Sequence, residues 1–129
     1  MTFVKSAALA AVIGFACTGA ALADIKDYTF QLVQKEVKTG DTTLAVRLIN
    51  TKTGKPIPDA VIMAKRIDMA PDGMETMTSS IEQLPSTEPG IYRFKTKLTM
   101  EGGWRLSLGA KVQGETGTVE SRLTLKAIK

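Results

Sequence analysis

The sequence contains no histidine and only one cysteine, Cys17, in 129 residues. The lack of histidine excludes Ser-His-Asp and Cys-His nucleophile systems, histidine zinc sites and imidazole acid–base catalysis. Aromatic residues are also scarce, at 5%. The length suits one domain, and the overall composition is that of an ordinary globular protein.

Residues 1–23 have the pattern of a secretory signal peptide. Lys5 provides a positive start, the apolar run 7–16 is too short to span a bilayer comfortably, and Ala21-Leu22-Ala23 is a small-x-small cleavage pattern. We therefore predict cleavage after Ala23, a periplasmic location, and a single domain over 24–129 with no transmembrane span. An acylated Cys17 is the alternative, but Gly14 lies where a lipoprotein signal has a large aliphatic residue.

Removal of Cys17 with the signal peptide would leave a chain without disulfides, thiolate metal sites or thiol redox chemistry. The 17 Lys and Arg residues slightly outnumber the 13 Asp and Glu residues, and the two signs are interleaved. No basic stripe with stacking aromatics is present, so a nucleic-acid partner is not expected. The positive balance gives a weak preference for acidic partners or membrane surfaces.

The recurring hydropathy pattern has a period of two and is interrupted by Gly, Pro and Asp. Between residues 104 and 112, for example, Trp, Leu, Leu, Ala and Val alternate with polar or small residues, as in a strand with one buried face. Seven such segments are separated by turn residues. This pattern predicts an all-β fold, a seven-stranded antiparallel immunoglobulin-like β-sandwich. The predicted strands are 28–37, 42–50, 59–69, 74–84, 90–99, 104–113 and 117–128.

Three methionines surround one predicted turn. If residues 70–73 form the loop of a hairpin, Met69 and Met74 close it as directly opposed residues, with Cβ atoms about 4.5–5.5 Å apart. Met77 follows Met74 by three residues, so a regular strand points it to the opposite face. Only a bulge or an early end of the strand would bring Met77 to the pair.

Met100 opens a second predicted turn, which is followed by Trp104. Two strands separate the two turns, and alternate connections in an antiparallel sandwich emerge at the same end, so the turns should share one rim. Thioethers without nitrogen or thiolate ligands select soft monovalent ions, above all Cu(I) and Ag(I), and an indole face can lie over a cation. We predict a metal site at Met69, Met74, Met77 and Met100, with Trp104 as an adjacent aromatic.

Packing is the competing explanation for the same residues, because methionine is a flexible core filler. Met63, inside an apolar segment, is predicted only to pack in the core. For the turn methionines, packing and ligand roles both stay open. Trp104 begins a strongly alternating strand, which favours core packing over cation contact. Gly102-Gly103 is interpreted as a two-residue turn.

Several segments together resemble a known family. They are Gly-Lys-Pro-Ile-Pro-Asp-Ala-Val at 54–61, the methionine turn at 69–77, Pro-Gly-Ile-Tyr-Arg-Phe at 89–94 and Met-Glu-Gly-Gly-Trp-Arg-Leu at 100–106. Over residues 41–113 the chain resembles the YtkA-like, FixH-like group of exported domains.

The resemblance implies a small periplasmic β-sandwich associated with heavy-metal and copper handling, efflux systems or oxidase assembly. The positions that it implies are Met69, Met74, Met77 and Met100, with Trp104 beside them. Any imidazole site of relatives is excluded here because the chain has no histidine. Full FixH proteins are membrane-anchored, whereas the apolar start of this chain has a cleavable pattern.

Two functions follow as predictions. The first is a periplasmic metallochaperone that binds Cu(I) or Ag(I) and hands it to an efflux or oxidase-assembly membrane complex. The second is a metal-free immunoglobulin-like interaction module of such a complex. Sulfur atoms at the rim favour the carrier, and sulfur atoms wholly inside favour the module. An enzyme is not expected, because Asp59, Asp68 and Glu75 have no paired spacing and no phosphate-binding glycine loop is present.

Overall fold

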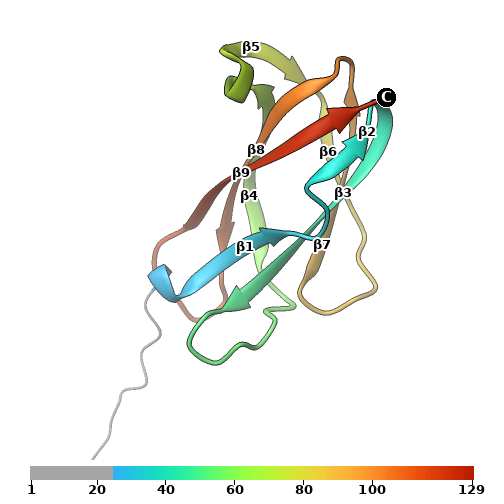
Figure 1. Ribbon diagram of the computed structural model, residues 1–129. Coiled ribbons are helices and arrows are strands. Elements are labelled where there is room, and N and C mark those ends of the chain that lie inside the picture. Colours follow the sequence, from blue (N-terminus) through green and yellow to red (C-terminus); the bar gives the residue numbers. More distant parts are fainter. Residues whose placement is uncertain (1–24) are drawn as a thin grey trace, which may run out of the picture.

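The computed structural model describes residues 25–129, so Cys17 and the predicted signal peptide and cleavage site lie outside the described residues. Within the described range the chain forms two face-to-face β-sheets and two short 3-10 helices (Figure 1). No helix in this range is long and apolar enough to cross a membrane. The elements are η1 (Ile25–Asp27), β1 (Tyr28–Leu32), β2 (Glu36–Lys38), β3 (Gly40–Asn50), β4 (Val61–Met69), η2 (Ala70–Asp72), β5 (Met74–Ser79), β6 (Ile81–Leu84), β7 (Ile91–Leu98), β8 (Gly102–Lys111) and β9 (Val119–Ile128).

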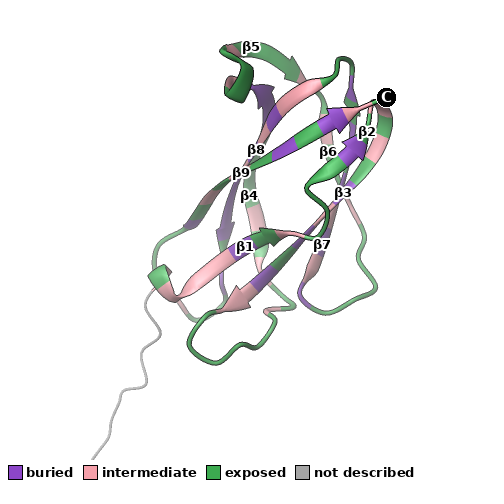
Figure 2. Cartoon of the chain, in the orientation of Figure 1, coloured by how far each residue is buried: buried purple, intermediate pink, exposed green. Residues whose placement is uncertain are grey.

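The two sheets enclose a single apolar core. One sheet has the strand order β1-β3-β7-β6 and the other has the order β2-β9-β8-β4-β5. Buried positions alternate with accessible ones along β3, β7 and β8, as a strand with one inward face requires (Figure 2). The predicted all-β sandwich is therefore confirmed. Its largest fully buried side chains include Trp104, Phe94, Leu44, Leu48, Ile67, Met69, Leu98 and Leu106.

The predicted number of seven strands is wrong, because two of the predicted strands each divide between the sheets. The segment 28–37 contributes β1 to the four-stranded sheet and β2 to the five-stranded sheet. The segment 74–84 contributes β5 to the five-stranded sheet and β6 to the four-stranded sheet. The first crossing also makes β2 run parallel to β9, which departs from a purely antiparallel arrangement. Alternation of apolar residues marks a strand, but it does not mark the sheet to which that strand belongs.

Met63 does not pack in the core, contrary to the sequence-based prediction. The register between β4 and β8 shifts between Ile62 and Ala64, so Met63 is the additional residue of a β-bulge. A bulged residue is displaced from the regular alternation of its strand. The Met63 side chain is 60% exposed as a result.

Candidate metal site at the methionine hairpin

The turn between β4 and β5 is built by its proline and glycine. Pro71 lies in the first turn of η2, where its fixed φ fits and its missing N–H is not needed. Gly73 ends η2 at φ 75°, a left-handed conformation that glycine adopts without strain, and its N–H donates to the carbonyl oxygen of Ala70 at 2.9 Å. Met69 and Met74 then pair directly across the hairpin. The predicted hairpin and its opposed methionine pair are confirmed.

The second turn meets the first, as the topology predicted. The N–H of Gly103 donates to Asp72 Oδ2 at 3.1 Å, and η2 and the β7–β8 connection lie at the same end of the sandwich (Figure 1). This contact places Met100, two residues before Gly102, at the methionine hairpin's end of the molecule.

Gly102 and Gly103 are not the turn that the sequence suggested. They are the first two residues of β8 and pair with Ala127 and Lys126 of β9. Their lack of side chains allows η2 to lie against them: a Cβ on Gly102 would be 2.2 Å from Asp72 Oδ2, and a Cβ on Gly103 would be 2.8 Å from the Cβ of Pro71. Close approach of two segments, and not chain reversal, explains this glycine pair.

The four predicted sulfur ligands differ in exposure. Met69 is fully buried, and its Cε lies 3.1 Å from the position that a Cβ on Gly102 would occupy. Met74 is half-buried, while Met77 and Met100 are 37% and 40% exposed. One thioether is therefore inside the sandwich and three have access to solvent, an arrangement between the rim and interior extremes considered from the sequence.

Met77 lies in an irregular part of β5. The pairing moves from Met69 with Met74 to Asp68 with Thr78, so residues 75–77 are additional on the β5 side. A bulge of this kind was the condition for Met77 to approach the other methionines. Its displaced backbone is held by Arg66, whose Nη2 donates to the carbonyl oxygen of Glu75 at 2.8 Å. The place of Met77 in a ligand set stays a prediction.

Trp104 is completely buried and holds the second turn in place. Its Nε1–H donates to the carbonyl oxygen of Met100 at 3.0 Å, which satisfies the buried indole donor. This hydrogen bond ties the ring to the β7–β8 connection. Its contact with a bound cation stays a prediction.

Asp68 is a structural residue of the site, a role that the sequence analysis did not predict when it considered Asp68 only as a possible catalytic carboxylate. It is fully buried, and its Oδ1 accepts the N–H of Ala70 at 3.0 Å, while Oδ2 accepts from Arg66 Nε at 2.8 Å and Arg105 Nη2 at 3.3 Å. Burial raises the pKa of Asp68, but the Ala70 N–H and the two guanidinium groups together outweigh it, so the pKa lies below its ordinary value. Asp68 therefore anchors the start of the methionine hairpin as a carboxylate.

The spacing of Asp68 and Ala70 was the only local signal for this anchor. An Asp side chain that accepts the N–H two residues ahead forms an Asx-turn, and this spacing precedes the Pro-Asp-Gly turn. The two arginine partners depend on strand pairing: Arg105 lies opposite Asp68 on β8.

Harder metal donors do not gather in the part of the chain that the structure describes. No group of three or more Asp, Glu, Cys or His side chains within residues 25–129 is arranged to hold a metal ion. In that range the soft donors are methionine sulfurs alone, since histidine is missing and the one cysteine is Cys17.

The family model described as YtkA-like matches residues 22–109, which includes the methionine hairpin, Met100 and Trp104. The chain belongs to the YtkA-like family. This YtkA-like protein matches no curated protein.

Several solved structures are similar to this YtkA-like domain. The Lin-41 filamin domain is 19% identical, with 83% of this chain and 95% of that chain covered and a TM-score of 0.46. The ZirS C-terminal domain is 10% identical over 94% of this chain and 88% of that chain, also with a TM-score of 0.46. The endo-beta-1,4-mannanase from Thermotoga petrophila is 14% identical, with 82% of this chain but 21% of that chain covered and a TM-score of 0.43.

Proposed function

We propose that this YtkA-like protein is a periplasmic carrier that binds Cu(I) or Ag(I) through methionine thioethers and passes the ion to a membrane efflux or oxidase-assembly complex. One observation carries the proposal. Met69 and Met74 are directly opposed across a hairpin whose turn packs on Gly102 and Gly103, next to the connection that bears Met100. Export is supported by the signal-like segment 1–23.

The chemistry of the donors suits a soft monovalent ion. Thioethers are neutral and polarizable, so they favour Cu(I) and Ag(I) over Zn(II), Mg(II) or Ca(II). Asp72, Glu75 and Glu101 lie within two residues of these methionines and are exposed. Their negative charge raises the local concentration of cations without supplying a hard ligand set.

The exposure of the sulfurs suits transfer. Met69 approaches the ion from the interior, while Met74 and Met100 remain accessible to an incoming ligand of a partner. An ion held partly by accessible thioethers can leave by stepwise ligand exchange. Thioethers also titrate little with pH and form no disulfides, which is an advantage outside the cytoplasm.

A Cu(I) titration against a competing chelator tests the proposal. We expect saturable binding tighter than about 1 µM, an affinity at which occupancy is appreciable at low metal concentration. Met74→Leu and Met100→Leu, which conserve side-chain volume, should each weaken binding at least about tenfold. Met63→Leu is the matched control, because Met63 is an exposed thioether six residues from Met69 along β4, about 20 Å away in an extended strand.

The metal-free interaction module is the second candidate, and the complete burial of Met69 and Trp104 favours it. In that case the methionines only pack, and Cu(I) and Ag(I) bind no more tightly than they do to an unrelated protein. Binding that is equally affected by Met63→Leu and Met74→Leu would also contradict the carrier.

A further inference from the structure

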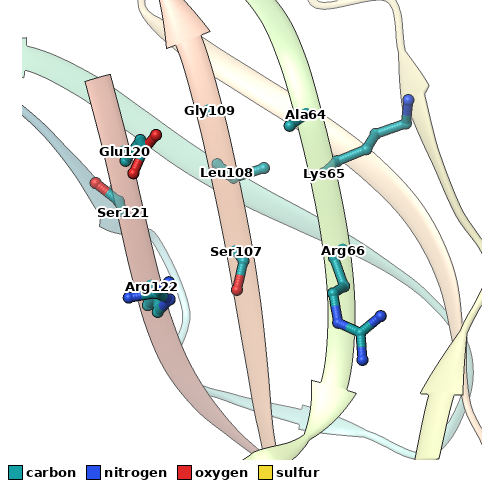
Figure 3. Close-up of a pocket in the computed structure, with 9 residues that line it drawn as sticks. All are labelled: Ala64, Lys65, Arg66, Ser107, Leu108, Gly109, Glu120, Ser121 and Arg122. Carbon is teal, nitrogen blue, oxygen red and sulfur yellow. The ribbon is translucent and has the colours of Figure 1, made fainter. Parts of the chain in front are cut away.

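The outer face of the five-stranded sheet carries a depression of about 460 Å³ over β4, β8 and β9 (Figure 3). It lies on the surface that faces away from the core, and its lining includes Arg66, Ser107, Gly109, Glu120 and Arg122. The site proposed for the metal uses none of these residues.

Strand register places two arginines on either side of a serine. Arg66 of β4 lies opposite Ser107 of β8, and Ser107 lies opposite Arg122 of β9 (Figure 3). Neighbouring strands are about 4.8 Å apart, so the two arginine backbones are about 10 Å apart with a hydroxyl group between them. We call Arg66, Ser107 and Arg122 the arginine row.

The neighbouring row leaves room beside these charges. Ala64 and Gly109 lie side by side in register, and Glu120 of β9 completes the row. The small side chain of Ala64 and the absence of one at Gly109 deepen the depression there. The carboxylate of Glu120 lies at one side of it. The residues that line the depression therefore include three basic ones, Lys65, Arg66 and Arg122, and one acidic one, Glu120.

The charges differ in how they are held. The side chains of Arg122 and Glu120 are exposed and form no hydrogen bond or ion pair with any residue that the structure describes. The side chain of Arg66 is 54% exposed, yet its Nε is paired with Asp68 and its Nη2 with the carbonyl oxygen of Glu75. Arg66 is thus pre-organised, which lowers the entropy lost when an anion binds it.

We propose that the arginine row is a docking surface for an acidic segment of a partner protein, with two carboxylates about 10 Å apart that pair with Arg66 and Arg122. A protein segment fits better than an anionic bilayer, because the surface is concave and Glu120 would repel a uniformly negative plane. Glu120 selects a partner that also carries a cation. This inference goes beyond the proposed metal function and holds whether or not the thioethers bind an ion.

The docking surface lies near the methionine hairpin. Arg66 precedes Met69 by three residues on β4, which is about 10 Å along an extended strand. Arg66 Nη2 also donates to the carbonyl oxygen of Glu75, the residue after Met74. A partner bound at the arginine row would therefore be close to the methionine hairpin.

An amide-resolved NMR titration of the protein, expressed from its full sequence, with a short oligo-glutamate peptide tests the proposal. We expect saturable shifts at Arg66, Ser107 and Arg122. Arg122→Glu should weaken binding about tenfold or more, because a like charge at a docked carboxylate repels it. Lys97→Glu, an exposed charge reversal on the other sheet, is the control and should leave binding within about twofold.

Inorganic phosphate and vesicles of phosphatidylglycerol with phosphatidylcholine are parallel arms of the experiment. Phosphate that produces the same shifts with the same affinity would overturn a segment-binding surface in favour of a free-anion site. Vesicle binding that is stronger than peptide binding and is lost in Arg122→Glu would overturn it in favour of a membrane surface. Equal effects of Arg122→Glu and Lys97→Glu would leave only nonspecific attraction and also overturn it. If Arg122→Glu does not fold, Arg122→Gln gives the same comparison with a smaller expected loss.

Discussion

Replacement of Gly102 by alanine should loosen the contact between the two turns at the methionine end of the protein. The backbone of Gly102 has φ 133°, which L-residues rarely adopt, and an added Cβ would lie 2.2 Å from Asp72 Oδ2 and 3.1 Å from Met69 Cε. The first distance is shorter than real Cβ contacts, and the second is tighter than nine in ten of them. The Asp72 carboxylate must therefore move aside, and the end of the Met69 side chain must give by a few tenths of an ångström.

The cost has two parts. Backbone strain at such a position is on the order of 1–3 kcal/mol for a residue other than glycine. Displacement of the Asp72 carboxylate also breaks its hydrogen bond with the N–H of Gly103, which contributes about 1 kcal/mol. The expected loss in the free energy of unfolding is thus about 2–4 kcal/mol.

Urea unfolding followed by the fluorescence of Trp104, the single tryptophan of the chain, measures this loss. Gly114→Ala is the matched control, since Gly114 has φ 87° but no atom within 4 Å of its added Cβ. It should show the strain without the collision. A Gly102→Ala cost no larger than that of Gly114→Ala would refute the close approach.

A double-mutant cycle identifies the colliding partner. Asp72→Ala removes the carboxylate, so the combined loss of Gly102→Ala and Asp72→Ala should be smaller than the sum of the single losses by about 1 kcal/mol. Strict additivity would mean that the added methyl group does not meet Asp72.

Two further predictions concern buried polar groups. Asp68→Asn should lower the free energy of unfolding at neutral pH by about 2 kcal/mol, because the guanidinium groups of Arg66 and Arg105 lose the buried anion with which they pair. The pKa of Asp68 is lower in the folded protein than in the unfolded chain. The stability that its carboxylate contributes is therefore present above the unfolded pKa of about 3.9 and is lost as the pH falls below that value. Asp68→Asn should flatten this part of a plot of the free energy of unfolding against pH. Tyr92→Phe should lower the free energy of unfolding by about 1–2 kcal/mol, because the phenol accepts the N–H of Ala60 at 3.0 Å and donates to the carbonyl oxygen of Ile57. Thermal unfolding at neutral pH measures this loss, and an unchanged unfolding temperature would contradict it.

Local sequence signals predicted the sandwich and the methionine hairpin correctly. The alternation in 104–112 depends only on which face of a strand is buried, and the Pro-Asp-Gly turn fixes which residues close the loop. Met69 and Met74 could therefore be paired before any long-range contact was known. The shared end of the two turns followed from counting reversals of the chain.

Features that depend on contacts between distant residues could not be predicted from local sequence signals. Ser80 and residues 33–35 carry the chain between sheets, but the alternation on either side is the same as in one continuous strand. The bulge at Met63 also has no local sequence signature, so an apolar segment suggested a core residue. The arginine row depends on the register of three strands, so the spacing of residues along any one strand could not predict it.

The parallel pairing of β2 with β9 has a consequence for how the protein assembles. β2 lies near the beginning of the described chain, yet the three residues that complete its ladder, 126–128, come after every other strand. Joining such distant partners carries a high loop-closure entropy, so this seam should form late in folding. Until then, β2 is unpaired at the edge of the five-stranded sheet. Because β9 is synthesised after all the other strands, this pairing cannot form before the rest of the described chain has been made.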